Sequence, residues 1–296
     1  MNILFGTYDA YNSLKTEAGG IYYFMKSLRK YSDCKVVILC HKRFEFEDLK
    51  KFANEMNFEI YTNYEPTCHM VYYRFKIYRE YLLQSKTKYE KILMTDVTDV
   101  IFQEDPFRIE FTEDIYCALE TNKYFEETIS SQMNVKWIKE CLHLPNMNLD
   151  IFKDKHIICA GTILGKYETI YKYLEFYDAV QNYSTDRVIN DQGLLNVYVY
   201  TNLCSASIIP WQKSKILTLD RISFDKLKII NNSIVNENNE KYAIIHQINA
   251  VFEYDTEDEA CEAGENMLSD YESYLVPSSY NGEIDLSELE SIGDTL

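Results

Sequence analysis

Short apolar runs alternate with segments of helical periodicity along most of the chain. Apolar runs of roughly four to eight residues are typical of buried strands, and apolar positions three or four apart indicate one face of a helix. Regular strand–helix alternation predicts a parallel sheet with right-handed crossovers. The predicted order at the start is strand 2–5, helix 21–30, strand 36–40, helix 46–56 and strand 59–62.

The same alternation continues towards residue 249, interrupted by a polar, insertion-like region at 121–155. We therefore expect an α/β fold, with a mostly parallel central sheet flanked by helices, in a single domain that spans residues 1–254. The further predicted elements are helix 70–83, strands 92–94, 100–102, 114–119 and 156–165, helix 167–177, a helix from near 192, and strand 241–249.

The acidic residues are unevenly placed. The chain of 296 residues has a formal net charge of −17, yet 30 basic and 33 acidic side chains precede residue 253, so the body is nearly neutral. Residues 255–296 have no basic side chain and little periodicity, which predicts a flexible tail or a lid. No basic stripe is present that could hold a phosphate backbone, so nucleic acid is not an expected partner.

The eight cysteines form no C-x-x-C pair, and several lie inside apolar runs. This placement is typical of small buried residues in a reducing compartment rather than of a disulfide framework. No apolar run approaches the roughly 18 residues that cross a bilayer. The first residues also lack the charged head and long apolar core of a signal peptide. We therefore expect a cytoplasmic protein without a transmembrane segment.

The strongest chemical signal is a pair of carboxylates after the apolar run 92–94. Asp96 and Asp99 follow this run and precede a second one, 100–102. Residues three apart on a strand point to opposite faces, so both carboxylates serve one site only if the backbone leaves the strand between them. Open α/β sheets bind ligands at such strand ends. The alternative is a pair of turn aspartates that cap the loop.

The string from Lys91 to Phe107 combines a strand, Asp-x-x-Asp, an apolar triplet and Asp-Pro-Phe. It resembles the metal motif of GT-A type, nucleotide-sugar-dependent glycosyltransferases. The resemblance implies a GT-A (Rossmann-like) fold and a bound divalent cation, with Asp99 at the position of the second Asp of the family's Asp-x-Asp. Asp96 lies one residue further upstream than the first, which leaves open whether it binds the metal or the ribose of the donor.

The end of the first predicted strand is a candidate donor contact. In the GT-A order this strand meets the nucleotide, which implies contacts from Gly6, Thr7 and Tyr8, with Gly6 allowing close approach and Tyr8 stacking on the base. An ordinary tight turn is the alternative. Gly19-Gly20 ahead of the next predicted helix also fits a phosphate on helix amides, as in GT-B glycosyltransferases, which need two Rossmann-like halves.

Arg74 and Arg79 lie off the apolar stripe of the helix predicted at 70–83. This segment resembles the one that precedes the metal motif in related transferases, where an arginine meets the donor diphosphate. The planar guanidinium fork suits phosphate oxygens. The alternative is a solvated helix face in which the arginines pair with Glu80.

Two later strings resemble GT-A elements beside the donor sugar. Ala160-Gly161 matches the core of an Asn-Ala-Gly string, with Cys159 where Asn or Ser is common, and a β-bulge is the alternative for the glycine. Asp191 and Gln192 lie in a string like the Asp-Gln-x-x-Leu-Asn of family-eight-like transferases, which implies a catalytic position near the reacting sugar. An N-cap on a helix that begins near Gln192 is compatible with that role.

His246 ends the last apolar run. A lone histidine is usually structural, but GT-A enzymes of this kind commonly close the metal shell with a histidine on a late strand. The resemblance therefore implies a metal set of Asp99, His246 and Asp96. With two carboxylates and an imidazole, Mn²⁺ is favoured over Mg²⁺, because the nitrogen ligand suits the softer ion.

The resemblance implies transfer of a sugar from a UDP- or GDP-sugar to an acceptor hydroxyl on a glycan or protein, and the family-eight likeness favours retention. A hard cation would neutralise the diphosphate leaving group. Two other classes stay open. One is a metal-dependent phosphohydrolase that uses the same two aspartates, although the sequence shows no nucleophile or second cluster near the motif. The other is a catalytically inactive sugar-nucleotide-binding module.

Overall fold

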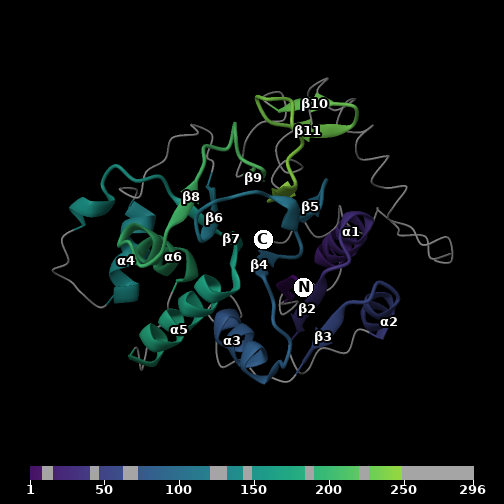
Figure 1. Cartoon of the computed structure of the whole chain (residues 1–296), viewed down its shortest axis with the longest axis horizontal. Helices are drawn as coiled ribbons and strands as arrows, with labels where there is room; N and C mark the ends of the chain where they lie inside the picture. Colours follow the sequence, from purple (N-terminus) through teal and green to yellow (C-terminus); the bar gives the residue numbers. More distant parts are fainter. Residues whose placement is uncertain are drawn as a thin grey trace, which may run out of the picture.

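A computed structural model of the chain describes residues 1–8, 16–40, 47–62, 73–120, 132–142, 149–183, 190–219 and 227–248. Its centre is a seven-stranded sheet in the order β3-β2-β1-β4-β7-β6-β8 (Figure 1). β7 runs antiparallel to both of its neighbours, and every other pair in this sheet is parallel. The strands are β1 (Ile3–Tyr8), β2 (Lys35–Cys40), β3 (Glu59–Tyr61), β4 (Lys91–Asp96), β6 (Ile115–Leu119), β7 (Ile158–Lys166) and β8 (Ala206–Ile208). The predicted α/β class with a mostly parallel sheet is confirmed.

Helices cover both faces of this sheet because its strands are apolar on both sides. Alternate residues of β1 show this: Leu4 packs in the core under α1 and α2, whereas Ile3 and Phe5 pack in the core under α3, α5 and α6. In Figure 1, α1 and α2 accordingly lie apart from α3 and α5. The helices are α1 (Thr16–Tyr31), α2 (Glu47–Glu55), α3 (Arg74–Gln84), α4 (Gln132–Leu142), α5 (Tyr167–Tyr183) and α6 (Asp191–Tyr200).

Two smaller sheets complete the described structure. A three-stranded sheet has the order β5-β12-β9, with β12 antiparallel to β5 and parallel to β9. All the residues of these three strands are buried. The second sheet is the hairpin β10-β11, at the top of Figure 1. The strands are β5 (Val100–Phe102), β9 (Ile216–Thr218), β10 (Lys228–Ile230), β11 (Ser233–Val235) and β12 (Ile244–His246).

The predicted elements occur in the predicted order, with differences at their boundaries. α1 begins at Thr16, so Gly19-Gly20 lie inside the helix and not ahead of it. The run expected as strand 241–249 is a strand only at Ile244–His246, because the chain turns at Gln247, whose φ is 61°. The insertion-like region contains α4 and a 3-10 helix at Asp150–Phe152. The acidic tail, 255–296, lies outside the described residues, so its predicted role stays a prediction.

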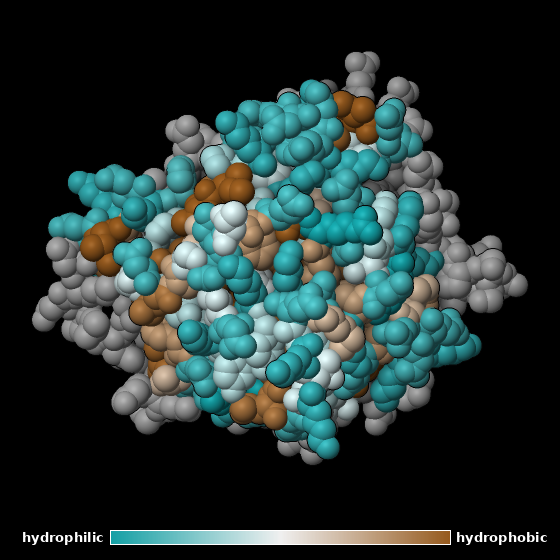
Figure 2. All heavy atoms as spheres, viewed as in Figure 1, coloured by the Kyte–Doolittle hydropathy of each residue, from teal (hydrophilic) through white to brown (hydrophobic). Residues whose placement is uncertain are grey.

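The surface is mainly hydrophilic on the face shown in Figure 2, where apolar side chains form separate brown patches. None of the helices in the described ranges is both long and apolar enough to span a bilayer. Five of the eight cysteines have described side chains, and these five are free thiols. Four of them are buried: Cys34, Cys40, Cys117 and Cys159.

Candidate metal centre

The two aspartates flank a tight turn between β4 and β5. Asp96 is the last residue of β4, and the chain then bends through Val97 and Thr98 before β5 begins at Val100. α1 packs against this turn. A Cβ added at Gly20 would lie 2.6 Å from the carbonyl carbon of Thr98 and closer still to its oxygen. Gly20 thus lets the helix backbone rest directly on the turn, which gives the second glycine of Gly19-Gly20 a packing reason.

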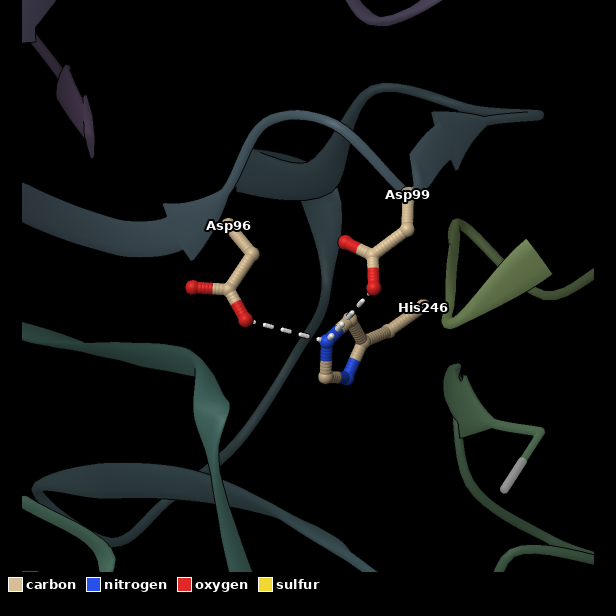
Figure 3. Close-up of side chains that lie close together, drawn as sticks. All are labelled: Asp96, Asp99 and His246. Carbon is tan, nitrogen blue, oxygen red and sulfur yellow. Dashed lines mark hydrogen bonds and ion pairs between the residues drawn. The ribbon is translucent and has the colours of Figure 1, made fainter. Parts of the chain in front are cut away.

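Asp96, Asp99 and His246 bring one potential ligand atom each to the same point (Figure 3). These atoms all lie within 4.8 Å of one another. His246 Nε2 is 3.2 Å from Asp96 Oδ2 and 3.8 Å from Asp99 Oδ2. The backbone therefore leaves the strand between the two aspartates, as the shared-site prediction required. Sequence alone could not distinguish this arrangement from two independent turn aspartates.

His246 reaches the turn from the small sheet. It pairs with Val100 of β5 on one side and with Thr218 of β9 on the other. The left-handed backbone at Gln247 then sends the chain back across the turn, where the Ile248 amide donates a 3.0 Å hydrogen bond to the Asp99 carbonyl oxygen. A non-glycine residue with positive φ costs about 1–2 kcal/mol, and here the surrounding contacts offset that cost. His246 and Asp99 are consequently fixed to each other through the backbone.

Gly161 makes room for the histidine ring. β4 and β7 are antiparallel with Thr95 opposite Thr162, which brings Asp96 next to Gly161. A Cβ at Gly161 would lie 2.5 Å from His246 Nε2 and 2.8 Å from Asp96 Oδ2. Glycine is thus required here because the imidazole and the carboxylate occupy the space of a side chain.

The donor set fits a divalent cation such as Mn²⁺. Two carboxylates and one imidazole are ligands of the kind that Mn²⁺ accepts in proteins. Asp99 Oδ1 is buried and has no hydrogen-bond partner. Such an atom is costly unless a ligand satisfies it. A cation held by Asp96, Asp99 and His246 would provide that ligand.

Burial and mutual charge shift the pKa values of all three residues. Burial raises the pKa of Asp99, and the Asp96 charge adds to that shift. Burial also acts to raise the pKa of Asp96, but the Arg74 charge and the hydrogen bond from His246 outweigh it and hold this pKa well below its ordinary value. Burial acts to lower the pKa of His246, yet Cys159, Asp99 and Asp96 raise it well above its usual range. Both carboxylates thus interact with the same imidazole nitrogen, Nε2 of His246.

Arg74 is buried at the start of α3 and links Asp96 of the candidate metal centre to Asp191 of α6. Its Nη1 donates to Asp96 Oδ1 at 2.5 Å, and its Nη2 donates to Asp191 Oδ2 at 2.5 Å. Its side chain is only 6% exposed, so the alternative of a solvated helix face is wrong for this residue. The guanidinium is already engaged with two carboxylates. The diphosphate contact expected for Arg74 remains a prediction.

Arg79, one turn further along α3, does not join the centre. It pairs instead with Asp178 at 3.2 Å and with Glu175 at 3.7 Å on α5. The alternative that the sequence offered, a pairing with Glu80, is replaced by this link between helices. Arg79 therefore ties α3 to α5 across the sheet face that they cover.

Asp191 and Gln192 open α6 beside β7. Asn190 caps the helix by accepting from the Gly193 amide at 2.8 Å, which confirms the predicted N-cap. Asp191 Oδ1 accepts from the Gln192 amide at 2.8 Å. The Gln192 side chain accepts from the Ala160 amide at 3.3 Å. The first turn of α6 is thereby fastened to the strand that carries Gly161.

Gly6, Thr7 and Tyr8, the candidate donor contacts at the end of β1, pack against neighbouring residues of the protein. A Cβ at Gly6 would overlap the Val97 side chain, so the glycine makes room for the turn. The Thr7 hydroxyl lies 2.6 Å from the Tyr78 hydroxyl, and Tyr8 is 1% exposed. The structure brings Thr7 opposite Asp96 on the neighbouring strand. Donor binding by Gly6, Thr7 and Tyr8 stays a prediction.

Glu120 is a site residue that sequence reasoning missed. It directly follows β6, and its Oε2 accepts from Gln192 Nε2 at 2.8 Å. The signal was available, because Glu120 is the polar residue after a strand of the same sheet. Asn196 ends the string that resembles Asp-Gln-x-x-Leu-Asn, and its side chain bonds both the amide and the carbonyl of Ile158 at 2.9 Å, which holds α6 against β7.

No protein-family model matches this chain, and no curated protein matches it. Among solved structures it is similar to two crystal structures described as the glycosyltransferase GlyE in Streptococcus pneumoniae TIGR4. The first aligns over 92% of this chain and 62% of that chain, with 16% identity and a TM-score of 0.46. The second, the apo form, aligns over 98% and 63%, with 15% identity and a TM-score of 0.45. This chain thus spans about three fifths of the length of the solved structures it matches. Similarity at this level does not assign a family.

Proposed function

We propose that this chain is a metal-dependent glycosyltransferase that moves a sugar from a nucleoside diphosphate sugar to an acceptor hydroxyl. The observation that carries the proposal is the convergence of Asp96, Asp99 and His246, with one buried carboxylate oxygen of Asp99 left without a partner. The centre lies at the end of β4, the edge of an α/β sheet where nucleotides are commonly bound. The resemblance of the string 91–107 to the GT-A metal motif supplies the class of reaction.

The chemistry required of the site is the stabilisation of a diphosphate leaving group. A cation held by Asp96, Asp99 and His246 would supply Lewis-acid neutralisation of that charge. Neighbouring residues fix the positions of these ligands. Arg74 fixes Asp96, and the Asp99 carbonyl is fixed by Ile248. Preorganised ligands reduce the reorganisation that binding requires.

Asp191 is the proposed contact to a reacting hydroxyl. Burial raises the pKa of Asp191, although the adjacent Arg74 charge acts in the opposite direction. Both of its oxygens already accept one hydrogen bond, from Arg74 and from the Gln192 amide, and each can accept another. Because Arg74 offsets its negative charge, we assign it to orienting a sugar or acceptor hydroxyl rather than to removing a proton. Gln192 is assigned to positioning, since its side chain bonds Ala160 and Glu120.

The phosphohydrolase alternative requires a nucleophile or a second metal cluster. Within the described ranges, Asp96, Asp99 and His246 are the group that could hold a metal. No observation favours hydrolysis over transfer to an acceptor. A single cation site with an adjacent buried Arg–Asp pair fits better with cleavage of one diphosphate–sugar bond.

Incubation with a panel of UDP- and GDP-sugars in Mn²⁺ tests the proposal. Release of nucleoside diphosphate, rising when acceptor hydroxyls are added, is the expected result. Release of inorganic phosphate instead would establish a phosphohydrolase. Binding of a nucleotide sugar without any turnover would establish an inactive binding module.

The Asp191→Asn variant tests the assigned role. Turnover should fall by at least about a hundredfold, the lower range for an oriented catalytic contact, while the donor Kd changes little. Circular dichroism in urea checks that the variant is folded, because Arg74 loses one charged partner. Loss of donor binding with unchanged single-turnover rate would show that the assignment is wrong.

A further inference from the structure

The histidine of the metal centre has a second nitrogen that faces away from the two aspartates (Figure 3). This nitrogen, Nδ1, lies 3.5 Å from the sulfur of Cys159. His246 is 2% exposed and Cys159 is also 2% exposed, so bulk water does not reach either group. The Cys159 sulfur is therefore the group that can satisfy Nδ1.

The position of Cys159 follows from the alternation of β7. Cys159 and Gly161 are two residues apart on one strand, so they face the same side of the sheet. Gly161 leaves room for the Cε1–Nε2 edge of the ring, and Cys159 contacts the adjacent nitrogen, Nδ1. Two residues of one strand thus pack against neighbouring atoms of the imidazole.

The orientation of the ring decides whether the metal centre has its third ligand. An imidazole can bind a cation through Nε2 only if the hydrogen of the neutral ring is on Nδ1, and the partner of Nδ1 commonly fixes that arrangement. A sulfur at 3.5 Å is within the range for a hydrogen bond to a soft acceptor. At this position the chain has a cysteine where the GT-A resemblance led us to expect Asn or Ser.

We propose that Cys159 is a positioning residue for His246. Its sulfur accepts the Nδ1 hydrogen and so keeps Nε2 aimed at the carboxylates, where Nε2 would bind a cation in exchange for its own hydrogen. The inference rests on the metal-binding part of the proposed function and adds to it a residue for which no role was assigned. Loss of such an outer partner typically weakens metal binding by about 10- to 100-fold.

The test uses the full chain with Mn²⁺ alone as the probe. Mn²⁺ affinity is measured by calorimetry, and electron spin-echo envelope modulation detects a nitrogen bound directly to Mn²⁺. The wild type should show this nitrogen, and His246→Gln should lose it, which assigns the signal. Cys159→Ala should bind Mn²⁺ about tenfold or more weakly and lose or weaken the nitrogen signal. Cys159→Ser, which keeps an acceptor, should recover most of both.

Cys117→Ala is the matched control, because Cys117 is an equally buried thiol, 1% exposed, on the neighbouring strand β6. It should change neither the nitrogen signal nor the Mn²⁺ affinity. An unchanged signal and affinity in Cys159→Ala would overturn this inference and leave the proposed function standing. A wild type that binds no Mn²⁺ would overturn both, and a wild type that binds Mn²⁺ without a nitrogen signal would remove His246, and with it this inference, from the metal set.

Discussion

Replacement of Gly161 by alanine places a methyl group where the metal centre has no free space. The added Cβ would lie 2.5 Å from His246 Nε2 and 2.8 Å from Asp96 Oδ2. Real Cβ atoms do not approach other atoms this closely, so the ring or the strand has to move. The ring is the easier group to move, because the hydrogen bonds of β7 to β4 and β6 hold the strand.

The size of the effect follows from the cost of overpacking. Forcing an extra methyl group into a packed site costs about 1–3 kcal/mol. In the metal-free variant the imidazole can turn aside, so this cost falls on metal binding, where the ring has to return to its ligating position. A coupling of this size corresponds to about 5- to 150-fold weaker Mn²⁺ affinity.

Calorimetric titration of Mn²⁺ measures this loss, and thermal unfolding in chelator measures the stability of the metal-free variant. Gly165→Ala, four residues further along the same strand, is the control. Its Cβ would meet Ile170 at 2.8 Å, so it should lower the melting temperature without weakening Mn²⁺ binding. Wild-type Mn²⁺ affinity in Gly161→Ala would refute the packing of His246 against this glycine.

Three further substitutions test other parts of the site. Gly20→Ala should displace the turn at Thr98 and so lower both the melting temperature and the Mn²⁺ affinity, and a variant that binds Mn²⁺ normally would contradict the contact between helix and turn. Arg74→Met leaves the buried Asp191 without its charged partner and should destabilise the fold by about 3–5 kcal/mol in urea titrations, whereas a loss below about 1 kcal/mol would count against the bridge. Asp99→Asn should abolish tight Mn²⁺ binding while leaving the metal-free melting temperature unchanged or higher, since one oxygen of the carboxylate is buried without a hydrogen-bond partner. A marked fall in that temperature would assign Asp99 a structural role.

The order of the elements could be predicted because local pattern dominates it. Apolar runs such as 36–40 are buried on both sides, and both helices that flank them show one apolar face. The boundaries were harder to predict where tertiary packing decides them. α1 extends back through Gly19-Gly20 although glycine disfavours helices, because Gly20 is needed for its contact with Thr98.

The candidate ligands could be predicted from motif and position, but their partners could not. Nothing local to Arg74 indicates that it bridges Asp96 and Asp191, which are distant in sequence and meet only through the sheet. The contact between Cys159 and His246 has the same origin, since β7 and β12 belong to different sheets. Glu120 could have been found by examining the residue that follows each strand.

Titration of UDP and of GDP into the protein, in Mn²⁺ and again in chelator, tests most directly whether Asp96, Asp99 and His246 hold a cation for a nucleoside diphosphate. We expect one of the two nucleotides to bind in Mn²⁺ and its affinity to fall by at least about a hundredfold in chelator, as the loss of a bridging charge requires. His246→Gln in Mn²⁺ should fall between these two states. Equal affinity with and without Mn²⁺ would contradict the metal centre as the basis of nucleotide binding.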